Sequence, residues 1–157
     1  MEYRKLPHGE ETISILGLGT SSIGIAGEKE AEAVMNLALE SGINFFDMAS
    51  SDAVPFPAYG RAISGMREKF YFQVHFGANY LTGKYGWTTD LDTVKRSIDW
   101  QLSALKTDYI DFGFLHCIDE ESDLTTVLKS GILEYIKELQ QQGTARCAGR
   151  SPAVAAL

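Results

Sequence analysis

Short apolar runs alternate with helix-like patterns along the whole chain, and this alternation restricts the fold more than any other feature. Strands are predicted at 13–19, 43–46, 70–76, 109–115 and 144–149. Helices are predicted at 28–41, 58–65, 131–142 and over a long segment that starts near Thr89, while 77–87 is expected to be a loop. Strands spaced in this way by helices pair in parallel through right-handed crossovers. The pattern predicts an α/β fold, either a doubly wound sheet or a barrel.

The length decides how much of a barrel the chain can hold. A complete (β/α)8 barrel takes about 250 residues, whereas this sequence has 157. We therefore expect four to five βα units: an N-terminal hairpin over 1–14, about four and a half units over 15–149, and an irregular tail over 150–157. Such a chain is consistent with a fragment of a longer protein. An open barrel edge exposes unpaired backbone, which favours self-association.

Charge and composition exclude several classes of partner. The net charge of −7 disfavours nucleic acid, and no apolar run has the roughly 18 to 20 residues that span a bilayer. The first residues lack the apolar stretch of a secretory signal. Cys117 and Cys147 are too few for a disulfide framework or a four-iron cluster. We expect a cytoplasmic protein.

Three polar residues stand at the ends of successive predicted strands: Asp47, His75 and His116. Parallel α/β folds place their sites at the carboxyl ends of strands, so we expect these side chains on one rim, with Asp52 in the loop after the first strand. Two carboxylates held together should raise the pKa of one, and both histidines should be favoured as imidazolium. The same four groups could instead bind a divalent metal that activates water in a hydrolase-like site.

Several motifs occur in the order of one known family. The run Gly-Ile-Asn-Phe-Phe-Asp-Met-Ala at 42–49 and the run 107–116, which ends in Leu-His, are the most specific; 1–6, 16–20 and 60–69 add further matches. Together they resemble the aldo/keto reductases, which are (β/α)8 TIM barrels. Segments 73–77, 88–97 and 116–121 resemble a divergent branch that carries a ferredoxin-type domain after the barrel.

The resemblance implies NADPH-dependent interconversion of small-molecule carbonyls and alcohols. In the family a Tyr protonates the carbonyl oxygen, a Lys and an Asp tune the Tyr, and a His orients the substrate. Asp47 and His116 match two of these positions, but Asp52 stands where the family has Tyr and His75 where it has Lys. An ionised Asp has no proton to give. Tyr59, in an irregular Pro-rich segment, is a further candidate.

The resemblance also assigns Gly19, Thr20 and Ser151 to cofactor contacts. The family binds most of its NADPH with the second half of the barrel. We therefore expect weak NADPH binding and no aldehyde reduction above background from these residues alone. The remaining alternative is a folded remnant without activity.

Overall fold

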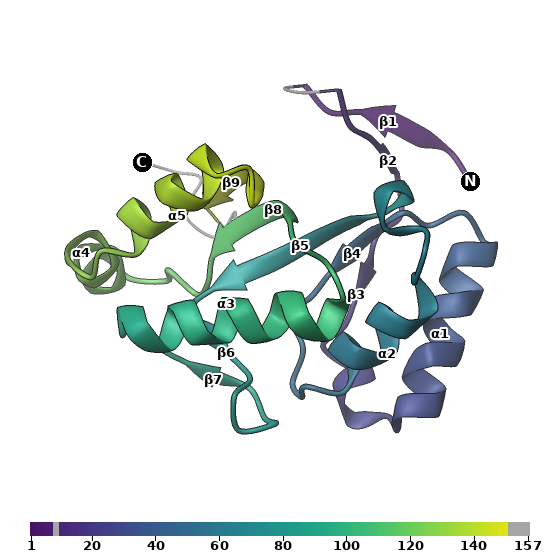
Figure 1. Cartoon of the computed structure of the whole chain (residues 1–157), viewed down its shortest axis with the longest axis horizontal. Coiled ribbons are helices and arrows are strands. Elements are labelled where there is room, and N and C mark those ends of the chain that lie inside the picture. The colour runs from purple at the N-terminus through teal and green to yellow at the C-terminus, as the bar shows by residue number, and fades with distance from the viewer. Residues whose placement is uncertain (8–9, 151–157) are drawn as a thin grey trace.

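The five strands of the main sheet all run parallel, in the order β3-β4-β5-β8-β9. The computed structural model describes residues 1–7 and 10–150, and Figure 1 shows its helices following the strands as in a barrel that is partly built. The predicted (β/α) barrel architecture with four to five units is thereby confirmed. The strands of this sheet are β3 (Leu18–Gly19), β4 (Phe45–Asp47), β5 (Tyr71–Phe76), β8 (Ile110–Leu115) and β9 (Ala145–Arg150).

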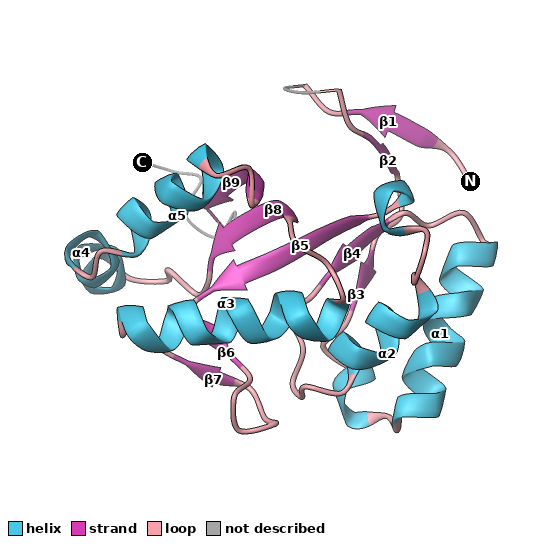
Figure 2. Cartoon of the chain, viewed as in Figure 1, coloured by secondary structure: helices cyan, strands magenta, loops and turns pink. Residues whose placement is uncertain are grey.

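Five α-helices and two short 3-10 helices connect these strands in the described part of the chain, and two hairpins flank the sheet (Figure 2). One hairpin pairs β1 with β2, and the other pairs β6 with β7. The helices are η1 (Ile23–Ile25), α1 (Glu28–Glu40), α2 (Pro55–Ala62), η2 (Arg67–Lys69), α3 (Leu91–Leu105), α4 (Glu121–Lys129) and α5 (Ile132–Gln141), and the hairpin strands are β1 (Tyr3–Lys5), β2 (Thr12–Ser14), β6 (Ala78–Asn79) and β7 (Gly86–Trp87).

Local signals explain where the helices begin and end. Helix α1 stops before Gly42, whose φ of 81° suits a residue without a Cβ. Helix α3 is capped by Asp90, which accepts a hydrogen bond from the backbone N–H of Thr93, so the cap lies one residue after the predicted Thr89. Helix α2 begins at Pro55, because the fixed φ of proline suits the first turn of a helix.

Four elements depart from the sequence-based prediction. The run 13–19 is not one strand, because β2 ends at Ser14 and β3 covers only Leu18–Gly19. The segment expected to be a loop at 77–87 contains the β6–β7 hairpin, and helix α2 starts three residues before the predicted 58. Helix α4 was not predicted, because its apolar positions are few: Val127 is its only buried residue. None of these departures changes the order of the parallel strands.

The helices and the sheet enclose the core on one side of the strands. Phe46 and Phe72 point from the sheet toward Tyr59 of α2, Met35 of α1 and Ile98 of α3, and all five are buried. The alternate side chains of the same strands face the other way. There an apolar hollow of about 190 Å³ is lined by Phe45, Phe112 and Phe114, together with residues of the β1–β2 segment.

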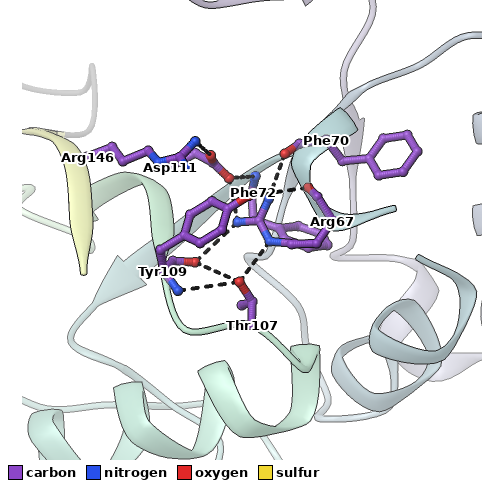
Figure 3. Close-up of polar contacts among 7 residues, drawn as sticks. All are labelled: Arg67, Phe70, Phe72, Thr107, Tyr109, Asp111 and Arg146. Carbon is purple, nitrogen blue, oxygen red and sulfur yellow. Dashed lines mark hydrogen bonds and ion pairs between the residues drawn. The ribbon is translucent and has the colours of Figure 1, made fainter. Parts of the chain in front are cut away.

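A buried charge cluster fastens the amino-terminal ends of β5, β8 and β9 (Figure 3). Asp111 is 1% exposed and accepts hydrogen bonds from Arg67 Nη2 at 2.6 Å and from the backbone N–H of Phe72 at 2.9 Å. Arg146 Nη1 lies 3.4 Å from the other carboxylate oxygen. The two guanidinium carbons lie 4.0 and 3.9 Å from the ring centre of Tyr109. The polar groups at this end of the sheet therefore hold the strands together.

Among the residues that the structure describes, no helix has both the length and the apolar character needed to cross a membrane.

Candidate active site

The register of the sheet places the three strand-end residues on one face. Asp47 of β4 pairs with Gln73 of β5, and His75 pairs with Phe114 of β8. Because side chains alternate with a period of two residues, Asp47, His75 and His116 all point to the same side. Each lies one such step further along its strand than the one before. The stagger is that of a barrel, in which strands are tilted and shifted relative to their neighbours.

These three side chains form a continuous hydrogen-bonded chain. His75 Nε2 lies 2.7 Å from Asp47 Oδ1, and His75 Nδ1 lies 3.2 Å from His116 Nδ1. His75 is 6% exposed, so the contact with Asp47 is shielded from water. The predicted convergence of Asp47, His75 and His116 on one rim is what the geometry shows.

Tyr85 extends this chain to a fourth residue that the sequence analysis did not find. Its hydroxyl lies 3.0 Å from His116 Nε2, and the two rings meet edge to face with centroids 5.5 Å apart. Tyr85 lies immediately before β7, in the segment expected to be a loop. Tyr85 stands nine residues after the end of the predicted strand 70–76, so its position along the sequence did not mark it as a site residue.

Backbone and side-chain contacts hold the Tyr85 segment against the loop after β4. Lys84 forms an ion pair with Asp52, and the backbone N–H of Tyr85 donates to the carbonyl of Ser51 at 3.3 Å. On the other side, the Trp87 indole N–H donates to the carbonyl of His116 at 3.1 Å. The hairpin is thus attached on both sides of Tyr85, and the position of its hydroxyl follows from these attachments.

Two expectations about individual residues are wrong. Asp52 does not join the Asp47 chain through any contact in the described structure. We expected the pKa of Asp47 or Asp52 to be raised, whereas the hydrogen bond with Lys84 lowers the pKa of Asp52. Tyr59 is fully buried against Phe46, and burial raises its pKa. Its hydroxyl has no hydrogen-bond partner among the described residues. Tyr59 is therefore a core residue that does not reach the rim.

The expected charge of His116 is also wrong. Burial, and secondly the charge of His75, lower the pKa of His116 to about 4, despite the opposing effect of Asp47. His116 is therefore neutral at pH 7. A neutral imidazole has one N–H and one acceptor nitrogen, and so it can pass a proton between two partners.

The metal-dependent alternative finds no support in the geometry. Across residues 1–7 and 10–150, no three His, Cys, Asp or Glu side chains are grouped as a metal ion would require. Asp47, His75 and His116 are instead hydrogen-bonded directly to one another, and the Asp52 carboxylate pairs with Lys84.

A hollow of about 210 Å³ opens beside Tyr85 and His116. It lies at the carboxyl ends of the strands, where the loops after β3 and β4 meet the β6–β7 hairpin. Its volume suits a small organic molecule. The polar residues that line it are Ser21, Ser50, Ser51, Tyr80, Tyr85 and His116.

Two of the three residues assigned to cofactor contacts can be placed. A Cβ built on Gly19 would meet no described atom within 4 Å, so the end of β3 is open to a ligand beside Asp47. Thr20 is fully buried, and its hydroxyl donates to the carbonyl of Asp47 at 2.9 Å, so it holds the end of β4 in place. Ser151 lies outside the described residues.

The sequence model of the aldo/keto reductase family matches residues 15–156. This chain belongs to the aldo/keto reductase family. The resemblance carried by the motifs at 42–49 and 107–116 is thereby confirmed. The additional likeness to the branch with a ferredoxin-type domain stays a prediction.

Individual aldo/keto reductases agree with this assignment. The chain is 32% identical to an uncharacterized oxidoreductase, YqkF, of Bacillus subtilis, over 96% of this chain and 49% of that protein. It is 29% identical to L-galactose dehydrogenase of Arabidopsis thaliana, over 95% of this chain and 48% of that enzyme. The chain spans about half the length of the curated relatives it matches.

Solved structures show the same relationship. The aldo-keto reductase AKR11C1 of Bacillus halodurans, in its holo form, superposes with a TM-score of 0.75 at 29% identity, over 96% of this chain and 50% of that one. An aldo/keto reductase of Klebsiella pneumoniae, solved with NADP and acetate, has a TM-score of 0.62 at 21% identity, over 90% of this chain and 46% of that one. At that identity the second likeness shows the fold alone.

Proposed function

We propose that this chain forms the acid–base part of an NADPH-dependent carbonyl reductase site of aldo/keto reductase type, acting on a small carbonyl compound in the cytoplasm. The observation that carries the proposal is the hydrogen-bonded chain from Asp47 through His75 to His116, at the edge of a 210 Å³ hollow. Asp47 and His116 occupy positions that the family uses for catalysis. A carbonyl group in the hollow beside His116 would lie close to the O–H and N–H groups of the lining residues.

The residues present fit the reacting end of NADPH. The end of β3 is open at Gly19, next to Asp47, so a flat ring can lie against the backbone there. When bound, the reduced nicotinamide supplies the hydride that reduces the carbonyl carbon. Lys84, a cation on this rim, already pairs with Asp52, so the cofactor phosphates need other positive groups. We therefore keep the expectation that this chain binds NADPH weakly.

The expectation of no reduction above background depended on Asp52 and His75 standing where the family has Tyr and Lys, and on the few cofactor-binding positions that this sequence matches. Tyr85 is present at the rim, so slow turnover is expected once the weak cofactor site is filled. The test uses millimolar NADPH deuterated at C4 of the nicotinamide, a small aldehyde such as propanal, and mass spectrometry of the alcohol. We expect deuterated propanol above a blank without protein.

Matched variants separate a specific reaction from contamination. Asp47→Asn and His116→Asn should lower the yield of deuterated alcohol at least tenfold, in line with loss of acid–base assistance. Asp108→Asn removes an exposed carboxylate at the opposite end of β8 and should leave the yield unchanged. Absence of deuterated alcohol from the unaltered chain at saturating NADPH would overturn the proposal.

A further inference from the structure

We propose that Tyr85 is the proton donor of this site and that His116 and His75 connect its hydroxyl to Asp47 as a proton relay. The inference rests on the proposed function, because a proton donor is needed only if a carbonyl is reduced here. It assigns the role of the family's tyrosine to a residue of a different loop, 33 positions further along the chain than Asp52.

Tyr85 is the tyrosine at the hollow whose hydroxyl can turn toward a ligand. It is 40% exposed, and its described hydroxyl contacts are His116 Nε2 at 3.0 Å and Cys117 Sγ at 4.0 Å. Tyr80 also lines the hollow, but it is 1% exposed and its hydroxyl donates to the backbone of Ser50. Tyr80 therefore packs near the Tyr85 ring, with centroids 6.1 Å apart, and Tyr85 is the more exposed of the two tyrosines at the hollow.

The geometry allows two arrangements of protons along the relay, which differ by one proton. In the first, His75 carries both protons: Nε2–H donates to Asp47, Nδ1–H donates to His116 Nδ1, and His116 Nε2–H donates to the Tyr85 oxygen. The Tyr85 O–H then points into the hollow. In the second, His75 is neutral and keeps only Nε2–H, which still donates to Asp47. The other two hydrogen bonds are reversed: His116 Nδ1–H donates to His75 Nδ1, and the Tyr85 O–H donates to His116 Nε2.

The reaction converts the first arrangement into the second. As the carbonyl carbon gains its new C–H bond, the carbonyl π electrons move to oxygen, and the Tyr85 O–H bond breaks to form the alcohol O–H. Tyr85 regains a proton from His116 Nε2, and His116 Nδ1 takes the proton of His75 Nδ1. The carboxylate of Asp47 stays paired with His75 Nε2–H throughout. Water at the exposed Tyr85 returns one proton to the relay before the next turnover.

The pKa values of Tyr85 and His116 agree with these roles. Burial, and secondly the charge of Cys117, raise the pKa of Tyr85 to about 12, so the hydroxyl keeps its proton at neutral pH. The charge of Asp119 acts in the same direction. The lowered pKa of His116 keeps its ring neutral, as a relay between two partners requires.

Tyr85→Phe is the decisive variant, because it removes one oxygen and keeps the ring against Tyr80 and His116. In the deuteride assay it should lower the rate about 10²-fold or more, the usual range for a general acid. Without any cofactor, it should also shift the 15N NMR signal of His116 Nε2, which loses its hydroxyl partner. Tyr3→Phe is the matched control: Tyr3 is 45% exposed, lies in the N-terminal hairpin, and should change neither measurement.

The outcomes distinguish this proposal from the proposed function. A Tyr85→Phe rate within twofold of the unaltered chain, or an unmoved His116 signal, overturns the role of Tyr85. If the unaltered chain transfers no deuteride, the proposed function fails. The role of Tyr85 as a hydrogen donor is then tested separately, by the carbonyl 13C signal of labelled acetone added without cofactor. A downfield displacement by the unaltered chain but not by Tyr85→Phe supports Tyr85 as the hydrogen donor to a carbonyl, and equal displacement by both overturns it.

Discussion

His75 Nε2 and Asp47 Oδ1 lie 2.7 Å apart, and this contact joins the carboxyl ends of two adjacent strands. The imidazole is nearly inaccessible, with its side chain 7% exposed, whereas the carboxylate is 35% exposed. The Asp47 carboxylate is thus partly in contact with solvent, and its charge favours the protonated form of His116. Weak screening inside the site makes this influence measurable.

The first prediction concerns Asp47→Asn. The negative charge of Asp47 favours protonated His116, so its removal should lower the pKa of His116 below the present value of about 4. The ring signals of His75 should change at the same time, because Nε2 loses a charged acceptor. Titration of both imidazoles by 15N NMR measures these effects, with Asp108→Asn as the control. Unchanged signals of both histidines in Asp47→Asn would show that the chain of contacts is not formed.

The second prediction concerns stability against pH. The pKa of His116 falls from an ordinary value of 6.5 to about 4 on folding, so between these values the unfolded chain binds the additional proton. Stability from this group is therefore complete above pH 6.5 and is lost as the pH falls toward 4, by at most about 3 kcal/mol. Urea unfolding at several pH values should show a decline in this window. His116→Asn should flatten it, and a slope that persists in this variant would assign the effect to other groups.

The third prediction concerns the charge cluster at the opposite end of the sheet. Burial raises the pKa of Asp111 despite the opposing charge of Arg67, which shows how strongly this carboxylate depends on its partners. Arg67→Ala should lower the free energy of unfolding by about 3 to 5 kcal/mol, because it leaves a buried charge poorly compensated.

Arg61→Ala is the control for that measurement. Arg61 forms ion pairs with Glu28 and Glu32 at the surface, where such pairs contribute about 1 kcal/mol or less. Equal losses in Arg61→Ala and Arg67→Ala, measured by urea unfolding, would contradict the structural role of the buried cluster.

The main elements of the fold were predictable because their signals are local. The apolar stripe of α3, the glycine stop after α1 and the apolar run of β8 each lie within one short segment. Helix α4 was not predicted because only Val127 of its nine residues is buried, so it has no apolar stripe. The β6–β7 hairpin was not predicted because strands of two residues are too short to show an alternation of apolar and polar side chains.

The site was predictable only where strand ends define it. Asp47, His75 and His116 come together because parallel strands bring their carboxyl ends to one edge. Tyr85 and Asp52 depend on contacts between separate loops: Asp52 meets Lys84, a residue 32 positions away, and no periodic pattern encodes that pairing. The assignment of Asp52 to the cluster failed for this reason, whereas Tyr59 failed because helix α2 turns it into the core against Phe46.

The ion pair between Asp52 and Lys84 also makes this part of the site sensitive to dissolved salt. The Lys84 side chain is 77% exposed, so ions in solution screen its attraction to Asp52. Because Lys84 directly precedes Tyr85, high ionic strength should weaken the attachment of the Tyr85 segment to the loop after β4 and leave the barrel strands unchanged.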